Sequence, residues 1–234
     1  MSSILAPCLE SVRSLVLRAR VQLSPLRFYY FKAFRSSRRF SFRGRTYRYF
    51  YHRYQITWRD EWTVEVPIIW DAVQEHQGRS ILEVGNVLSH YYTVDHDIAD
   101  KCEVAEGVIN QDVVDFQPSR RYDLIVSIST LEHVGWDEEP REPMKALQAI
   151  QHLQGLLAPQ GKMIVTLPLG YDPNLDRLLR DEQPWLGDRF YLKRVTRDNR
   201  WIKVGWEDSQ NAEYGHPFPG ASALLVGVWE SASG

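Results

Sequence analysis

Short apolar runs separated by polar connections dominate the middle of the chain. The Leu, Ile and Val content of these runs fits strands buried on both faces. We place these strands at residues 80–84, 93–100, 108–110, 122–128 and 162–167. Apolar residues at helical spacing predict a helix over residues 143–157, between the last two strands. Strands that alternate with helices predict a mainly parallel α/β sheet with helices on both faces.

Further elements are predicted on both sides of this alternating region. Three later strands are expected at residues 189–196, 200–206 and 223–230, and the last of them is expected to join the edge of the sheet. Ahead of the first strand, apolar residues at helical spacing predict a helix between Trp58 and Gln77. Proline has no N–H group and disrupts the helix interior, so this helix either starts near Pro67 or is kinked there.

The first sixty residues carry two other patterns. Apolar residues from Ile4 to Leu23 recur every three or four positions, which predicts an amphipathic helix. It could pack on the protein, act as a targeting peptide or rest on an anionic membrane surface. Aromatic and basic residues alternate on either side of Arg43-Gly44, which predicts a β-hairpin. This hairpin could bind nucleic acid by stacking, line a substrate pocket or pack one face on the protein.

The net charge of −2 hides a strong asymmetry. Residues 1–60 carry 13 Lys and Arg against 2 Asp and Glu, a balance of +11. The remaining residues carry 15 against 28, a balance of −13. We therefore predict two regions: a basic amphipathic helix and aromatic hairpin extension over residues 1–57, and an α/β domain over residues 58–234.

The composition of the chain is that of an ordinary globular protein. It is 44% hydrophobic and 25% charged, and its 234 residues suffice for one well-buried core. The two cysteines are too few for a disulfide framework and show no zinc-binding spacing, so we expect no metal. No apolar run approaches the ~20 residues that span a bilayer, and the N-terminus lacks a signal-peptide core. The expected location is therefore cytoplasmic.

Polar residues stand where the predicted strands end, and open α/β sheets bind ligands outside the carboxyl ends of their strands. In chain order these residues are Glu83 and Gly85, then Asp95, Asp97 or Asp100, then Asp112, and then Ser129, Thr130, Glu132 and His133. The GxGxxG fingerprint of dinucleotide sites is missing after Gly85, and no GxxxxGK[ST] loop occurs. A ligand without phosphates needs fewer features: one glycine for close approach of the backbone, a carboxylate for ribose hydroxyls and a polar group for an adenine amine.

Four segments between residues 80 and 168 share their order with the motifs of one family. They are "ILEVGN", "VINQDVVDF", "RRYDLIVSISTLEHVG" and "LQGLLAPQGKMIVTLP". In this order they resemble the first strand and Glu-x-Gly turn, the third strand with its acid, the fourth strand with a Leu-Glu-His segment, and the fifth strand of class I S-adenosylmethionine-dependent methyltransferases. Longer stretches resemble a bacterial subgroup of undefined substrate. The resemblance implies a Rossmann-like class I methyltransferase fold and S-adenosylmethionine as cofactor.

The resemblance also implies which residues meet the cofactor. They are Glu83, Gly85, Asn86, Asp100, Asp112 and Ser129. Asp100 is our first choice for the carboxylate that binds the ribose, followed by Asp97 and then Asp95. Structural alternatives stay open, since Glu83 could hold its loop by hydrogen bonds and Asp112 could cap a turn.

The acceptor side is predicted from the segment after the fourth strand. His133 would be the base or an acceptor-orienting group, because a histidine with an ordinary pKa near ~6.5 can accept a proton at neutral pH; it could also be structural. Trp136 and Tyr171 would contact the substrate. The acidic run from Asp137 to Glu139 is expected to be solvated at a helix N-terminus.

We expect in-line methyl transfer to a small molecule or glycan, on oxygen. The alternative is a non-catalytic protein of the same fold that binds a protein, a membrane surface or nucleic acid through its basic aromatic N-terminal segment. A peripheral membrane or protein contact through the N-terminal helix stays open for either function. An N-methylating DNA enzyme is disfavoured, because "SIST" stands where amino-directed DNA methyltransferases carry NPPY or DPPY, and nucleic acid is not the expected partner.

Overall fold

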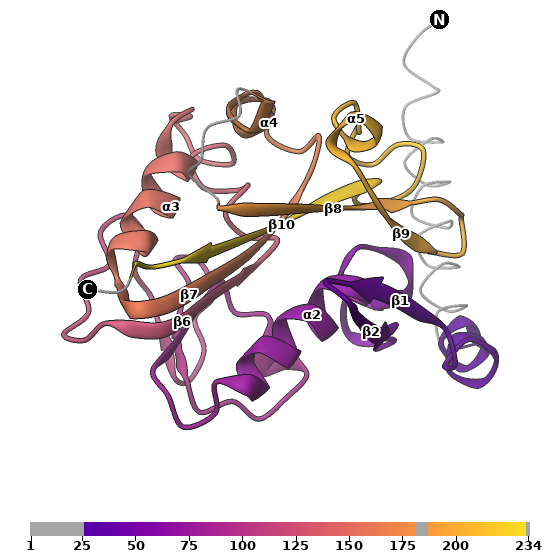
Figure 1. Ribbon diagram of the computed structural model, residues 1–234, viewed down its shortest axis with the longest axis horizontal. Coiled ribbons are helices and arrows are strands. Elements are labelled where there is room, and N and C mark those ends of the chain that lie inside the picture. Colours follow the sequence, from indigo (N-terminus) through magenta and orange to yellow (C-terminus); the bar gives the residue numbers. More distant parts are fainter. Residues whose placement is uncertain (1–25, 181–186, 233–234) are drawn as a thin grey trace, which may run out of the picture.

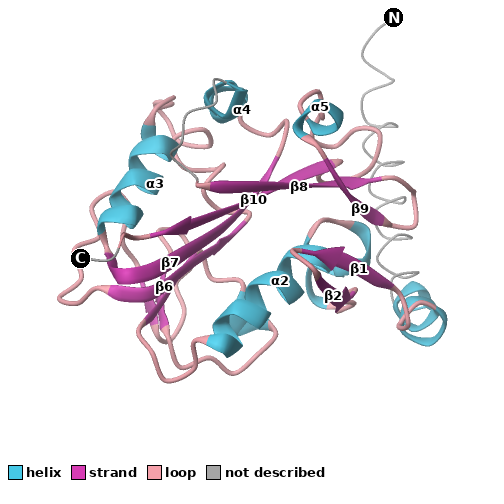
Figure 2. Cartoon of the chain, in the orientation of Figure 1, coloured by secondary structure: helices cyan, strands magenta, loops and turns pink. Residues whose placement is uncertain are grey.

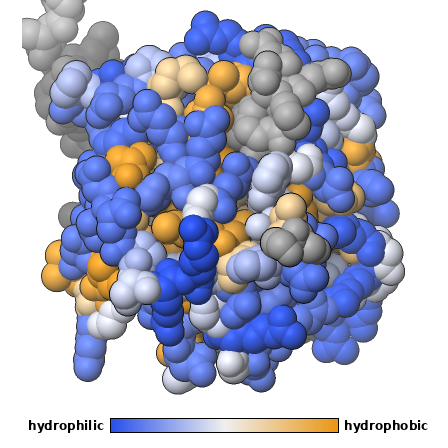
Figure 3. Space-filling model, turned by 60° about the vertical axis from the view of Figure 1, so that its left-hand side comes forward, coloured by the Kyte–Doolittle hydropathy of each residue, from blue (hydrophilic) through white to orange (hydrophobic). Residues whose placement is uncertain are grey.

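A computed structural model describes residues 26–180 and 187–232 of the chain. The predicted amphipathic helix from Ile4 to Leu23 lies outside these residues. Among the described helices, none is long and apolar enough to cross a membrane. The face shown in Figure 3 is largely hydrophilic with small hydrophobic patches, which is usual for the surface of a globular protein.

An eight-stranded sheet forms the centre of the described structure (Figures 1 and 2). Its strands are β3 (Ile81–Val84), β4 (Asp97–Ala99), β5 (Val108–Ile109), β6 (Tyr122–Ile128), β7 (Leu157–Pro168), β8 (Asp188–Arg194), β9 (Trp201–Val204) and β10 (Ala223–Glu230). In space their order is β5-β4-β3-β6-β7-β10-β8-β9. All neighbours from β5 to β7 are parallel, which confirms the predicted α/β sheet.

The order in which the chain adds strands to the sheet reverses beside β3. After β3 it adds β4 and β5 on one side, and it then returns to place β6 and β7 on the other. The carboxyl ends of β3 and β6 therefore meet at a topological switch point. This is the place where open α/β sheets bind their ligands.

The predicted position of the last strand at the sheet edge is wrong. β10 lies inside the sheet, where it pairs antiparallel with both β7 and β8. Its residues from Ala223 to Val228 are all buried, and an apolar strand covered on both faces belongs in the interior of a sheet. The outer position belongs to β9, whose Ile202 is 41% exposed.

Helices cover both faces of the sheet, as predicted (Figure 1). α3 (Lys145–Gly155) and α4 (Pro173–Arg180) contribute to the core on one face, and α2 (Trp62–Glu75) to the core on the other. Neighbouring residues of β6 point to opposite cores, with Ile125 on the α3 side and Leu124 on the α2 side. The remaining short elements are η1 (Tyr54–Arg59), η2 (Leu88–His90) and α5 (Trp206–Ser209).

The predicted hairpin at Arg43-Gly44 is confirmed. It consists of β1 (Arg39–Phe42) and β2 (Arg45–Arg48), which pair antiparallel. Phe40 and Phe42 are buried in the same core as α2. The hairpin therefore packs one face on the α/β domain, while the predicted division of the chain at residue 58 stays a prediction.

The helix predicted between Trp58 and Gln77 is confirmed as α2, and of the two alternatives for Pro67 the start near this residue is wrong, because α2 begins at Trp62. Proline cannot donate to the carbonyl oxygen four residues earlier, which belongs to Thr63. This oxygen instead accepts the backbone N–H of Phe50 at 2.9 Å, and the Thr63 hydroxyl donates to the Phe50 carbonyl oxygen at 3.0 Å. The segment after the hairpin thus takes up the hydrogen bond that Pro67 leaves open, which explains why the helix tolerates proline.

Candidate active site

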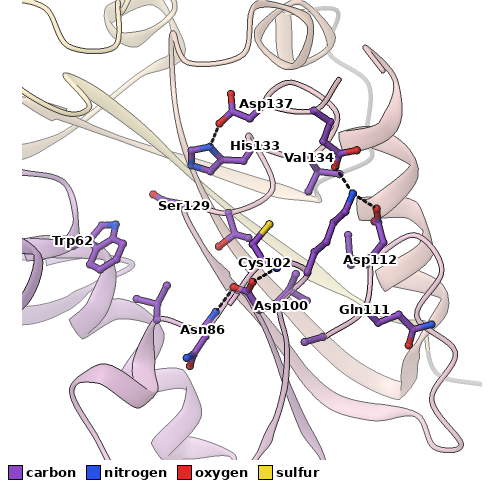
Figure 4. A pocket seen from close by; sticks show the side chains of 18 residues that line it. Trp62, Asn86, Asp100, Cys102, Gln111, Asp112, Ser129, His133, Val134 and Asp137 are labelled. Atoms are coloured by element: carbon purple, nitrogen blue, oxygen red, sulfur yellow. Dashed lines mark hydrogen bonds and ion pairs between the residues drawn. The ribbon is translucent and has the colours of Figure 1, made fainter. Parts of the chain in front are cut away.

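A cavity of about 420 Å³ opens at the switch point of the sheet (Figure 4). Small-molecule sites commonly measure roughly 300–1,000 Å³. Residues that follow β3, β4, β5 and β6 line it, together with Trp62 of α2. Six of the predicted site residues are among them: Gly85, Asn86, Asp100, Asp112, Ser129 and His133. Glu83, Trp136 and Tyr171 lie outside its wall.

Glu83 holds in place the loop after β3, which forms part of the cavity wall. Its side chain is fully buried, and Oε1 accepts the backbone N–H groups of Val87 and Leu88 at 2.9 and 2.8 Å. Its Oε2 lies 2.9 Å from Nε2 of His96. Both oxygens are therefore used to hold the loop after β3, which corresponds to the structural alternative for Glu83. A direct contact of Glu83 with cofactor stays a prediction.

Gly85 ends β3 in a conformation that favours glycine, with φ at +87°. A Cβ atom at this position would overlap the Thr130 hydroxyl group. The Gly85 N–H donates to the carbonyl oxygen of Ala99 at 2.9 Å and so ties the loop to the end of β4. The close passage of the loop past Thr130 therefore requires a residue without a side chain.

Asp100 follows β4 and organises the loops around it. Its Oδ1 accepts the N–H groups of Cys102 and Glu103, both at 2.8 Å, and its Oδ2 accepts the N–H of Asn86 at 3.0 Å. An ionised carboxylate has about four acceptor positions, so one position on Oδ2 is left for a ligand.

The other two aspartates considered for the ribose lie elsewhere. Asp97 begins β4 at the opposite end of the strand, where its Oδ2 accepts hydrogen bonds from Arg120 at 2.7 Å and from the Tyr122 hydroxyl at 2.8 Å. Asp95 is exposed ahead of the strand. Of the three candidates, the structure brings Asp100 to the cavity.

Asn86 lines the cavity with a side chain that the protein already uses. Its amide nitrogen donates to Glu103 Oε1 at 2.8 Å, and its amide oxygen accepts the hydroxyl of Ser89. A ligand would therefore meet an ordered loop at Asn86 rather than a free amide group.

Asp112 is held by two lysines that sequence reasoning missed. The Nζ atoms of Lys101 and Lys145 each lie 2.8 Å from its Oδ2. Burial raises the pKa of Asp112, but the hydrogen bonds from the two lysines outweigh it and bring the pKa to about 2. Among the described residues, Oδ1 has one weak partner, the Val114 N–H at 3.3 Å. Asp112 is thus an ionised carboxylate with one oxygen left to accept from a ligand.

His133 carries a ring that a carboxylate orients. Its Nδ1 lies 2.6 Å from Oδ2 of Asp137 (Figure 4). The Tyr171 hydroxyl donates to the same oxygen at 2.7 Å. A carboxylate can only accept, so Nδ1 carries the hydrogen and Nε2 keeps its lone pair. The carboxylate nearest to Nε2 is Glu132 at 3.7 Å, beyond hydrogen-bond range. His133 can therefore accept a proton at Nε2.

The acidic run lies in turns ahead of α3 and not at the predicted helix N-terminus. Asp137 is exposed, as predicted, and both Asp137 and Glu138 line the cavity. Burial raises the pKa of Asp137, but the hydrogen bonds from His133 and Tyr171 lower it below its ordinary value. Burial raises the pKa of Glu138, but the hydrogen bonds from Lys145, Lys101 and the Gly135 backbone together outweigh it and lower the pKa below its ordinary value. Both carboxylates are therefore ionised at the cavity wall.

Ser129 connects the cavity to a buried acid in α2. It has a positive φ of 41°, and its hydroxyl donates to Oε1 of Glu65 at 2.5 Å. Glu65 is fully buried, and its Oε2 has no hydrogen-bond partner in the described part of the chain. Burial, and next the charge of Glu61, raise the pKa of Glu65 to about 8. Glu65 is therefore largely protonated at neutral pH.

The aromatic side chain that lines the cavity is not one of the two predicted substrate contacts, Trp136 and Tyr171. The guanidinium of Arg141 lies over the Trp136 ring at 4.1 Å, outside the cavity wall. The Tyr171 ring lies 4.6 Å from the His133 ring and reaches the site through Asp137. Trp62 does line the cavity, although its spacing in the sequence indicated only a packed helix face.

Gly85→Ala should destabilise the protein more than Gly44→Ala. Both glycines have positive φ values, and a left-handed alanine costs about 1–2 kcal/mol. An added Cβ at Gly44 meets no atom within 4 Å, whereas at Gly85 it overlaps Thr130. Urea denaturation should therefore show that Gly85→Ala loses at least ~1 kcal/mol more unfolding free energy than Gly44→Ala. Equal losses would show that Thr130 moves aside without cost.

Glu65→Gln should become more stable than the wild type as the pH rises from about 5 to about 8. In this range the unfolded wild type loses the Glu65 proton, whose ordinary pKa is 4.5, while the folded protein keeps it until about 8. Wild-type stability therefore falls by up to about 1.4 kcal/mol per pH unit, and glutamine has no proton to lose. Denaturation at several pH values measures this difference, which should stop changing with pH below about pH 4.5. A difference that does not change with pH would contradict the buried neutral acid.

Comparisons with known proteins agree with this architecture. The family model described as "Methyltransferase domain" matches residues 74–222, more than half of the chain. No curated protein sequence matches the chain.

Solved structures with a similar fold include three methyltransferases. The N-methyltransferase NodS from Bradyrhizobium japonicum WM9 is 10% identical, with a TM-score of 0.40 over 72% of this chain and 94% of NodS. The 1,6-didemethyltoxoflavin-N1-methyltransferase of Burkholderia thailandensis, with bound 1,6-didemethyltoxoflavin and S-adenosylhomocysteine, is 15% identical, with a TM-score of 0.43 over 74% and 81%. An rRNA methylase from Streptococcus thermophilus is 11% identical, with a TM-score of 0.42 over 72% and 97%.

The family assignment rests on the family model, which spans every strand from β3 to β9. It confirms the resemblance found in the sequence. The chain belongs to the methyltransferase-domain family, and it is an S-adenosylmethionine-dependent methyltransferase with a Rossmann-like class I fold.

Proposed function

We propose that the protein transfers the methyl group of S-adenosylmethionine to an oxygen atom of a small molecule or glycan. The observation that carries this proposal is the pairing of His133 with Asp137 at the wall of the cavity. A hydroxyl becomes a better nucleophile when a positioned base accepts its proton. The cavity volume of about 420 Å³ is typical of small-molecule sites and therefore supports a small acceptor group.

The lining residues fit a cofactor that is cationic and lacks phosphates. Four acidic side chains and one basic side chain line the cavity, namely Asp100, Asp112, Asp137, Glu138 and Lys101. This balance favours a sulfonium ion and disfavours a pyrophosphate. The open acceptor position of Asp100 would take a ribose hydroxyl, and Oδ1 of Asp112 would take an adenine amine. Gly85, Asn86 and Ser129 would contact the cofactor along the loops that end β3 and β6.

The catalytic proposal assigns one proton transfer to the protein. When bound, S-adenosylmethionine supplies an electrophilic methyl group. His133 accepts the proton of the acceptor hydroxyl at Nε2, and the Asp137 charge stabilises the imidazolium that forms. Tyr171 fixes Asp137 from its other side. These contacts hold the base in one orientation, which reduces the entropic cost of reaction.

Trp62 is the proposed acceptor contact that the sequence did not reveal. In Figure 4 it faces the cavity from the side opposite Asp112. A sugar ring or an aromatic ring can pack on the apolar face of a tryptophan. Trp62 therefore replaces Trp136 as the proposed surface for a ring-shaped acceptor.

A non-catalytic protein that binds a partner through its basic aromatic segment is the second candidate. The hairpin offers less aromatic surface for this than its sequence suggested, because Phe40, Phe42 and Tyr49 are buried. Calorimetry with S-adenosylmethionine and S-adenosylhomocysteine separates the two functions. Binding of either compound supports the enzyme, and no binding at millimolar concentration would exclude it.

Asp100→Asn should weaken S-adenosylhomocysteine binding by about 10- to 100-fold. This range corresponds to the ~1.5–3 kcal/mol contributed by a hydrogen bond to a charged group. Asp95→Asn is the matched control, since Asp95 is exposed and lies ahead of β4, and it should bind like the wild type. Calorimetry measures both affinities, and thermal denaturation verifies that the Asp100 loops still fold. Equal affinities of the two variants would remove Asp100 from the cofactor site.

His133→Ala should lower turnover by about 10²- to 10⁴-fold and leave S-adenosylhomocysteine affinity unchanged. The acceptor is first sought in a panel of phenols, sugars and amines by release of S-adenosylhomocysteine. His216→Ala serves as the control, because the His216 side chain is 76% exposed and lies outside the cavity. Loss of the acid limb of the pH-rate profile in His133→Ala would support the base. Wild-type turnover in this variant would exclude it.

A further inference from the structure

The helix over residues 26–34 has an apolar face that no other described element covers. Its inner side packs on η1, where the rings of Phe28 and Phe31 lie 5.6 and 6.3 Å from the Trp58 ring. Its outer side bears large exposed residues. These are Leu26, Tyr29, Tyr30 and Phe34, exposed by 68, 58, 44 and 72%. Together with the exposed Ala33 they form what we call the outer face of this helix.

The outer face has the geometry of an interfacial helix. At 3.6 residues per turn, its five residues fall within an arc of about 140°. Arg27 and Lys32 lie at the two edges of this arc, and both are exposed. Basic side chains at such edges can reach polar headgroups while their stems cover apolar surface.

The segment of the chain that contains the helix is strongly basic. Residues 26–59 contain ten Lys and Arg residues and no Asp or Glu. Three of these basic residues have acidic partners: Arg35 and Arg38 pair with Asp198, and Arg45 pairs with Asp71 and Glu75. The other seven have no carboxylate within 4.0 Å in the described structure. Positive charge therefore remains available for an anionic partner.

We propose that the helix over residues 26–34 docks the protein on an anionic membrane surface. The outer face enters the interface, and the basic residues at its edges and on the neighbouring hairpin meet the lipid headgroups. Nucleic acid fits this surface less well, because Leu26 and Ala33 offer no ring for base stacking. Phe28 and Phe31 fix the helix to η1, so the outer face is presented by a folded element. This docking function is separate from the proposed methyl transfer.

Vesicle co-sedimentation of the full chain tests the proposal. The protein should pellet with vesicles of phosphatidylcholine mixed with phosphatidylglycerol, much less with phosphatidylcholine alone, and less at high salt. Leu26→Ser with Phe34→Ser should lower the partition coefficient at least about tenfold, because two large apolar side chains no longer leave water. Arg27→Glu with Lys32→Glu should lower it about tenfold or more.

The control is Val195→Ser with Ile202→Ser, two residues that are each 41% exposed near the β8–β9 edge. This pair should pellet like the wild type, and thermal denaturation should show that every variant is folded. All variants keep residues 1–25, so wild-type binding by Leu26→Ser with Phe34→Ser would assign the contact elsewhere and overturn the proposal. A wild type that stays in the supernatant with both vesicles would overturn it as well. So would a dimer without vesicles that this double variant abolishes, or binding to RNA but not to vesicles.

Discussion

A buried carboxylate must find its hydrogen-bond partners inside the protein, and in β3 this requirement falls on Glu83. It is met by the amides of Val87 and Leu88 on the following loop and by His96 ahead of β4. If the loop left the sheet, the buried Glu83 side chain would lose its hydrogen-bond partners, at a cost of several kcal/mol. The floor of the cavity, including Gly85, is therefore fixed by a side chain that does not line it.

Hydrophobic periodicity predicted the central strands well because their surroundings are uniform. The bounds of β6 and β10 match the apolar runs, since both strands are buried on both faces. β4 covers only Asp97–Ala99, because His96 turns to Glu83 and the residues before it form a loop. The position of β10 inside the sheet could not be predicted, because it depends on pairing with β7 and β8. The late strands have similar apolar content, so the sequence pattern does not show which of them pair.

The site residues that could be predicted are those whose position follows from the end of a strand. Asp100 and Asp112 follow their strands, and the carboxyl ends of parallel strands meet at one edge of the sheet. Lys145 and Glu65 gave no signal, because a charged residue in an amphipathic helix is normally solvent-exposed. Their burial depends on partners from distant segments, such as Asp112 for Lys145 and Ser129 for Glu65. Such partnerships exist only after the sheet has assembled.

Trp62, the proposed ring contact for the acceptor, comes from a part of the chain that precedes the rest of the site. The matched family region begins at residue 74, whereas Trp62 and Glu65 come from the earlier part of α2. The residues proposed to hold the cofactor all lie within the matched region. If Trp62 contacts the acceptor as proposed, substitutions ahead of that region change this contact while the strand ends stay untouched. Related chains could diversify in what they methylate by replacing this one helix, and they would keep a common methyl donor.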